Sequence, residues 1–169
     1  QLRNYARYLD AQVSDAALEL SAREISPKDK AYLAGLVRIS RHGQVLADQT
    51  GELVEIVHQV QEKGITLSKA SGDAIQYSLI PCGMNLKTLA IAFPSITEEI
   101  NESMRKQDDI LREIFTLQYR EYLDRFASGM TPSGSEFSRI LFQIEEMAST
   151  IREIRKSTLL LQEPEGKGK

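Results

Sequence analysis

One stretch of this chain resembles another stretch 101 positions further along. Residues 33–48 and 134–149 align without a gap, and similar side chains coincide in pairs: Leu36 with Phe137, Arg38 with Arg139, Ile39 with Ile140, Leu46 with Met147, and Ala47 with Ala148. A hydroxyl residue followed by proline, a common start of a helix, precedes each stretch, as Ser26-Pro27 and as Thr131-Pro132. Internal similarity of this kind is typical of repeated supersecondary units, so the sequence predicts two related helical units.

Apolar residues recur every three or four positions over most of the chain, and this period predicts helices. The segments, separated by glycine, proline and hydroxyl residues, are Leu2–Glu24, Pro27–Lys63, Leu67–Ala92, Pro94–Ala127 and Pro132–Leu161. Pro81 lies inside the third segment, where a proline removes a backbone hydrogen bond and predicts a kink or a break. We see no alternating strand pattern, so the predicted class is all-α, with long antiparallel helices in two related bundles.

The predicted division of the chain follows from these segments. Residues 1–64 would form a first helical repeat, incomplete because it has only two helices, and residues 65–161 a second repeat with three. Residues 162–169 lack a sustained apolar pattern and are predicted to be a disordered tail. A helix pair without a third helix leaves apolar surface exposed, so we also expect a homodimer.

The apolar stripes of three helices are predicted to face the core. They comprise Leu2, Tyr5, Leu9, Val13, Ala16, Ala17 and Leu20 in the first helix; Ile96, Ile100, Met104, Ile110, Ile114, Leu117 and Leu123 in the fourth; and Phe137, Ile140, Leu141, Ile144, Met147, Ile151 and Ile154 in the fifth.

Composition excludes several classes of protein. The net charge is −3 and the signs are mixed along the chain, which argues against nucleic-acid binding because that needs a basic surface. No apolar run approaches the roughly 20 residues that cross a bilayer. The one cysteine, Cys82, fits a reducing compartment and is expected to be a buried apolar side chain. The sequence starts at Gln1, with neither an initiator methionine nor a signal-peptide pattern, so we expect a piece of a longer protein.

Two runs within the related helices carry a resemblance to a known family. They are Gly43-Gln-Val-Leu-Ala-Asp-Gln-Thr50, with Leu53 and Glu55 downstream, and Ile144-Glu-Glu-Met-Ala-Ser-Thr-Ile151, with Ile154 downstream. In these runs the sequence resembles the PhoU family, and in particular the PhoU-like cytoplasmic domain at the carboxyl end of bacterial sodium/phosphate cotransporter proteins. The resemblance spans nearly the whole chain and implies two three-helix bundles.

The resemblance also implies a metal site, because the family's helices carry an acidic residue and an aspartate four positions apart. At that spacing two side chains share one helix face and can hold a divalent or iron-type cation. In this chain the pairs are Gln44 with Asp48 and Glu145 with Ser149, so each has lost one carboxylate. The candidate metal ligands are therefore Asp48 and Glu145, and the alternative interpretation is that both are solvated polar positions.

Two basic groups are further candidates, either as anion-binding patches or as ordinary surface ion pairs: Arg38, Arg41 and His42, and Arg152, Arg155 and Lys156. His42 and His58 lie on separate faces of one helix and cannot form a metal pair at i,i+4.

We find no catalytic constellation in the sequence, so the expected protein is not an enzyme. The resemblance implies a regulatory domain of a sodium-dependent phosphate transporter, at the cytoplasmic face of the inner membrane. Its partner would be the membrane transporter portion of the same longer chain. The alternatives are a dimeric helical signalling or scaffold module and a metal-binding helical bundle.

Overall fold

The computed structural model describes residues 1–129 and 132–162, without the side chains of Arg125 and Pro132. This part of the chain forms five helices and no strand: α1 (Leu2–Ser21), α2 (Pro27–Glu62), α3 (Lys69–Ala92), α4 (Glu98–Ala127) and α5 (Pro132–Gln162). The all-α prediction is confirmed. The predicted tail lies outside the described residues, except for Gln162, which ends α5.

Local signals account for several helix boundaries. The Ser26 hydroxyl accepts a hydrogen bond from the Asp29 amide at 3.1 Å, and Pro27 is the first residue of α2, as the sequence predicts. Gly64 follows α2 with a φ of 63°, a conformation that only glycine adopts without strain. The predicted start of the fourth helix at Pro94 is wrong: α4 begins at Glu98, where the Thr97 hydroxyl accepts from the Ile100 amide at 3.3 Å.

Of the two outcomes predicted at Pro81, a kink or a break, the break is wrong, because α3 continues through this residue. A proline removes only one hydrogen bond of the helix, and the Pro81 side chain is buried against the rest of the bundle. Packing of α3 against α4 and α5 therefore holds the helix together across this position.

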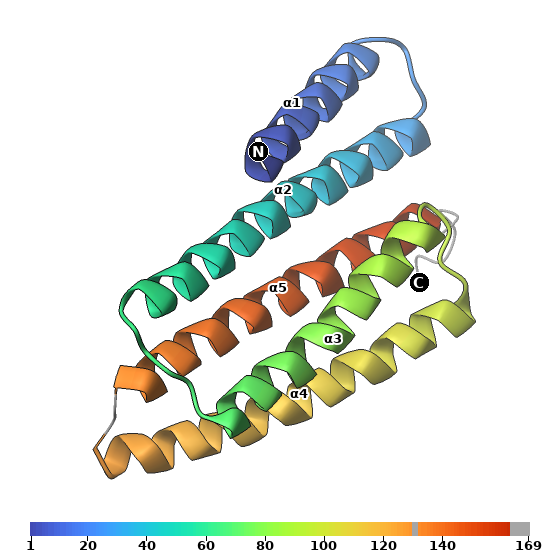
Figure 1. Cartoon of the computed structure of the whole chain (residues 1–169). Helices are drawn as coiled ribbons and strands as arrows, with labels where there is room; N and C mark the ends of the chain where they lie inside the picture. The colour runs from blue at the N-terminus through green and yellow to red at the C-terminus, as the bar shows by residue number, and fades with distance from the viewer. Residues whose placement is uncertain (130–131, 163–169) are drawn as a thin grey trace.

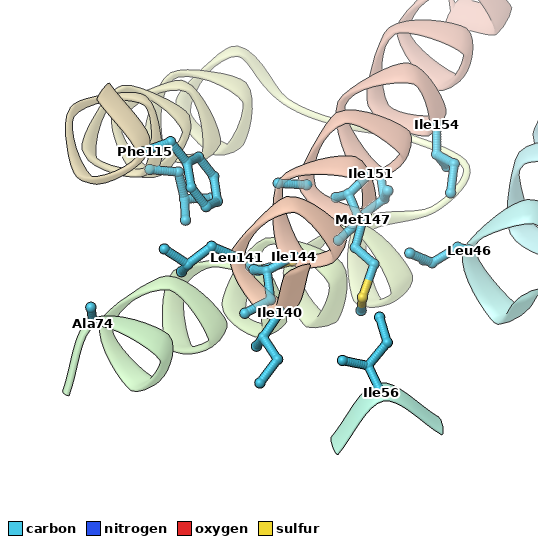
Figure 2. Close-up of a cluster of buried hydrophobic side chains, with 14 of the residues drawn as sticks. Leu46, Ile56, Ala74, Phe115, Ile140, Leu141, Ile144, Met147, Ile151 and Ile154 are labelled. Atoms are coloured by element: carbon cyan, nitrogen blue, oxygen red, sulfur yellow. The ribbon is translucent and has the colours of Figure 1, made fainter. Parts of the chain in front are cut away.

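The five helices form an elongated bundle in which α5 is central (Figure 1). α5 packs against α2, α3 and α4, whereas α1 packs against α2 alone. Residues 1–64 thus contain α1 and α2, residues 65–161 contain nearly all of α3 to α5, and the two parts meet where α2 lies along α5. One apolar cluster extends across both parts, with Leu46 and Ile56 of α2 directed towards Met147 of α5 (Figure 2).

α2 and α5 run antiparallel. Near one end Lys63 lies 2.7 Å from Glu136, and further along the Gln143 amide donates to the Gln49 carbonyl at 3.0 Å. At the other end a Cβ on Gly35 would overlap the Leu161 side chain, so the helices approach closely there.

The predicted apolar stripes have different outcomes. All seven residues of the α5 stripe are buried. In α4 the inward side chains include Met104, Leu111 and Phe115, whereas Ile110, Leu117 and Leu123 are exposed, so the predicted stripe of this helix is partly wrong. In α1 the predicted stripe is wrong for Leu2, Tyr5, Leu9 and Leu20, which are exposed because α1 has only one neighbouring helix.

Candidate functional site

The first predicted metal ligand, Asp48, lies between α1 and α2, where it is half-buried. Its Oδ1 accepts a hydrogen bond from Arg7 at 3.0 Å, and its Oδ2 accepts one from Gln44 at 2.8 Å. Arg3 donates to the Asp48 backbone carbonyl at 3.2 Å. Both carboxylate oxygens of Asp48 therefore already have protein donors, and a cation would have to displace Arg7.

Gln44 connects this ion pair to a second one. Its Oε1 accepts from Arg41 at 2.8 Å, and the same Arg41 nitrogen donates to Asp10 of α1 at 3.2 Å. Asp10 is the only fully buried residue of α1, which buries no apolar side chain completely. A polar network of Arg7, Asp48, Gln44, Arg41 and Asp10 therefore connects α1 to α2.

The second predicted metal ligand, Glu145, is half-buried on α5 and has its polar partner on α4. Tyr119 donates its phenol hydrogen to Glu145 at 3.0 Å, and its ring meets the edge of Phe142 with ring centroids 5.2 Å apart. Burial, together with this hydrogen bond, raises the pKa of Tyr119 to about 12, so the phenol stays protonated at neutral pH. Ser149, the other member of this predicted pair, is also half-buried.

Asp48 thus has partners from α1 and α2, and Glu145 has a partner from α4. In residues 1–129 and 132–162 there is no group of three or more histidine, cysteine, aspartate or glutamate side chains placed to hold a metal ion. The two-carboxylate metal site remains a prediction for which these contacts offer no support.

The sequence analysis missed a buried polar cluster formed by Asn85 of α3, Asp108 of α4 and Arg155 of α5. Asn85 donates to Asp108 Oδ1 at 2.9 Å and to the Met104 carbonyl at 3.3 Å. An Arg155 Nη2 atom lies 2.9 Å from Asp108 Oδ2, and the two side chains are only 8% and 6% exposed. Each helix of the α3–α4–α5 group therefore contributes one polar side chain to this cluster.

The charge of this cluster is unevenly compensated. Burial raises the pKa of the Asp108 carboxyl, and the nearby positive charges of Arg155 and Arg152 oppose that shift. Arg155 Nε and Nη1 are buried without a hydrogen-bond acceptor in the part of the chain that the structure describes. Arg155 thus carries a buried charge that depends mainly on Asp108 for compensation.

A signal for this cluster was present in the sequence. Asp108 falls four residues after Met104 and three before Leu111, both of which are buried. Arg155 follows Ile151 by four residues in the same way. A charged residue at a position where the helical period requires an apolar one predicts a buried charge with a partner on another helix.

For the two basic groups, ion pairs are seen at Arg41 and Lys156, in agreement with the second of the two interpretations. Arg155 is buried, so it does not share a surface patch with Lys156, which pairs with Glu153 at 2.7 Å. Arg41 is engaged with Asp10 and Gln44.

The single cysteine behaves as expected. Cys82 is buried on α3, as predicted. Burial, and to a smaller extent the negative charge of Asp108, raise the pKa of its thiol to about 11. The thiol is therefore protonated and unreactive at neutral pH.

A scan against protein-family models and searches of curated proteins and solved structures found no match to this chain. None of the helices is, within the described residues, both long and apolar enough to cross a membrane.

Proposed function

We propose that this chain is a non-catalytic regulatory domain of a sodium-dependent phosphate transporter, similar to the PhoU-like domains that its sequence resembles. It would lie at the cytoplasmic face of the inner membrane and contact the membrane portion of the same longer protein. Its action would be to shift the transporter between states through changes in helix packing.

One observation supports this proposal more than any other: the two similar stretches of sequence lie on α2 and α5, which pack against each other antiparallel. Equivalent residues of the two stretches are buried on both helices, namely Leu46 with Met147 and Ala47 with Ala148. Contact between equivalent helices supports two related units, although residues 1–64 contain two helices where the resemblance implies three.

The attachment of α1 offers a physical route for regulation. α3, α4 and α5 bury a continuous apolar core, whereas α1 is attached to α2 through partly exposed ion pairs. An exposed ion pair contributes at most about 1 kcal/mol, so a partner that offers competing charges or apolar surface can displace such a helix at modest cost. We therefore infer that α1 is the helix whose position a transporter contact would change.

Phosphate uptake tests this proposal. Cells that lack their own phosphate transport would carry the full-length protein that contains this chain, with either the native sequence or Arg7→Glu. We expect the substitution to change the rate of uptake several-fold, because two like charges then face each other at Asp48. A second substitution, Asp48→Arg, should restore the native rate by reversing the pair.

Arg112→Glu is the matched control, because Arg112 is exposed on α4 and, among the described residues, forms an ion pair only with its neighbour Asp109. This variant should leave uptake unchanged. Equal uptake by the native protein, the Arg7→Glu variant and a variant without this chain would refute the proposal. A coding sequence without membrane-spanning segments next to this chain would also refute it.

A further inference from the structure

α3 has an exposed stripe that follows the spacing of a coiled coil. Asp73, Tyr77, Ile80, Met84 and Lys87 are separated by four, three, four and three residues, which places them on one face of the helix. Tyr77, Ile80 and Met84 are 65%, 50% and 52% exposed. The opposite face of α3 is occupied by side chains that are buried in the bundle, so the stripe faces away from the core. In Figure 1 no other helix lies in front of α3.

α4 widens this stripe into a groove. Ile110, Ile114 and Leu117 of α4 lie beside Tyr77 and Ile80 and line an open groove of about 560 Å³ between the two helices. Ile110 and Leu117 are 46% and 55% exposed, so α4 also presents apolar side chains to solvent beside the α3 stripe. Two adjacent apolar stripes at helical spacing form the kind of surface that packs against another pair of helices.

The α3 stripe is symmetric about Ile80 in a way that indicates its partner. Asp73 and Lys87 lie seven residues on either side of Ile80, roughly 10 Å along the axis in each direction. If a second α3 lies antiparallel across a twofold axis at Ile80, Asp73 of one copy meets Lys87 of the other. The same operation places Tyr77 of one copy opposite Gly83 of the other, one residue away from Met84.

The charges at the two ends of the stripe fit this arrangement. Within the described part of the chain neither Asp73 nor Lys87 forms an ion pair or a side-chain hydrogen bond, although other charged residues of α4 and α5 do. In a twofold contact, Asp73 of each copy pairs with Lys87 of the other. The interface then contains two equivalent ion pairs, as the symmetry of an isologous contact requires. A helix from an unrelated partner would not require opposite charges at equal distances from the centre.

We propose that the groove between α3 and α4 binds a second copy of this chain, so that α3 and α4 of two copies form an antiparallel four-helix interface centred on Ile80. This interface is independent of the transporter proposal, because it concerns α3 and α4 and not the contact of α1 with α2. Failure of either proposal leaves the other unaffected.

Sedimentation equilibrium of the purified chain tests the interface, from low to high micromolar concentration. The native chain should be a dimer, and Ile80→Glu should weaken dimerisation roughly 100-fold or more because two carboxylates then meet at the axis. Val54→Glu is the matched control, since Val54 is also an exposed apolar side chain, at 63%, but lies on α2. It should leave the dimer intact, and circular dichroism should show the same helix content in all three proteins.

Exchanging the charges of Asp73 and Lys87 tests whether the partner in the groove is a second copy of this chain. Asp73→Lys alone and Lys87→Asp alone should each raise the dissociation constant roughly 10- to 30-fold, because each places like charges at two symmetric sites. The double variant should return to the native value. A native chain that is monomeric throughout, a dimeric Ile80→Glu variant or a double variant without recovery would each overturn the proposal.

Discussion

Replacing Arg155 with methionine should destabilise the protein strongly at neutral pH. The substitution preserves most of the volume of the side chain but leaves Asp108 buried without its cationic partner. Removal of one member of a buried ion pair costs about 3–5 kcal/mol, because the remaining charge is no longer compensated. A domain of this size has about 5–15 kcal/mol of stability in total, so the melting temperature should fall by roughly 6–20 °C.

The stability lost in Arg155→Met should become smaller as the pH falls. Burial already raises the pKa of Asp108 above its ordinary value of 3.8, and Arg155 is the largest influence that opposes this shift. Without Arg155 the folded-state pKa rises further, so the folded protein takes up a proton at a pH where the unfolded chain does not. The stability of Arg155→Met should therefore recover as the pH falls through the raised pKa towards 3.8.

Urea unfolding followed by circular dichroism, at neutral and at mildly acidic pH, measures both effects. Lys156→Met is the matched control, because Lys156 is exposed beside Arg155 and should change stability by no more than about 0.5 kcal/mol. The double variant Asp108→Leu/Arg155→Met should be close to the native stability, since neither charge then remains buried. A loss below about 1 kcal/mol for Arg155→Met, or a loss that does not shrink on acidification, would refute the reasoning.

Four further outcomes follow from the structure. Cys82 should not react with a thiol reagent at pH 8 until urea unfolds the chain, because burial raises the pKa of its thiol to about 11; rapid reaction of the folded protein would contradict this. One tyrosine should titrate near pH 12 by ultraviolet absorbance, and this transition should disappear in Tyr119→Phe and move to lower pH in Glu145→Gln; stability should fall as the pH rises from the ordinary value of 10.0 towards 12. Ser26→Ala should cost about 1 kcal/mol in urea unfolding because the cap of α2 is lost, and an unchanged midpoint would show that Ser26 does not cap the helix. Elemental analysis should find less than stoichiometric iron, zinc or manganese, because an arginine already pairs with Asp48; one metal ion per chain and lower stability after chelation would reverse this conclusion.

The helices were predictable where one apolar face is much stronger than the others. The stripe of α5 is buried in full, because a central helix with neighbours on several sides has little choice of orientation. α4 was harder, since Met104 and Leu111 fit one face while Ile110 and Leu117 fit another. Periodicity alone cannot decide which of two apolar faces turns inwards.

Polar contacts within one helix were predictable from the sequence, whereas contacts between helices were not. The contact of Gln44 with Asp48 follows from their spacing of four residues on one helix. Arg7 comes from a different helix, 41 positions away, so no local pattern could place it beside Asp48. Asp108 shares a face of α4 with Met104 and Leu111, but its burial and its pairing with Arg155 depend on how three helices pack together.

The antiparallel packing of α2 and α5 is the claim on which the interpretation as two related units depends. Electron paramagnetic resonance measures it directly, with spin labels on exposed cysteines introduced at Gln59 and Arg139, or at Gln59 and Leu160. Native Cys82 is buried and should not take the label. Labelled chains would be diluted with unlabelled ones, so that only distances within one chain are recorded.

Gln59 and Arg139 hydrogen-bond across the two helices at 3.4 Å, so this pair of labels should be close. Leu160 is 21 residues further along α5, so the other pair should be separated by roughly 30 Å. A short distance for Gln59 with Leu160 and a long one for Gln59 with Arg139 would contradict the account.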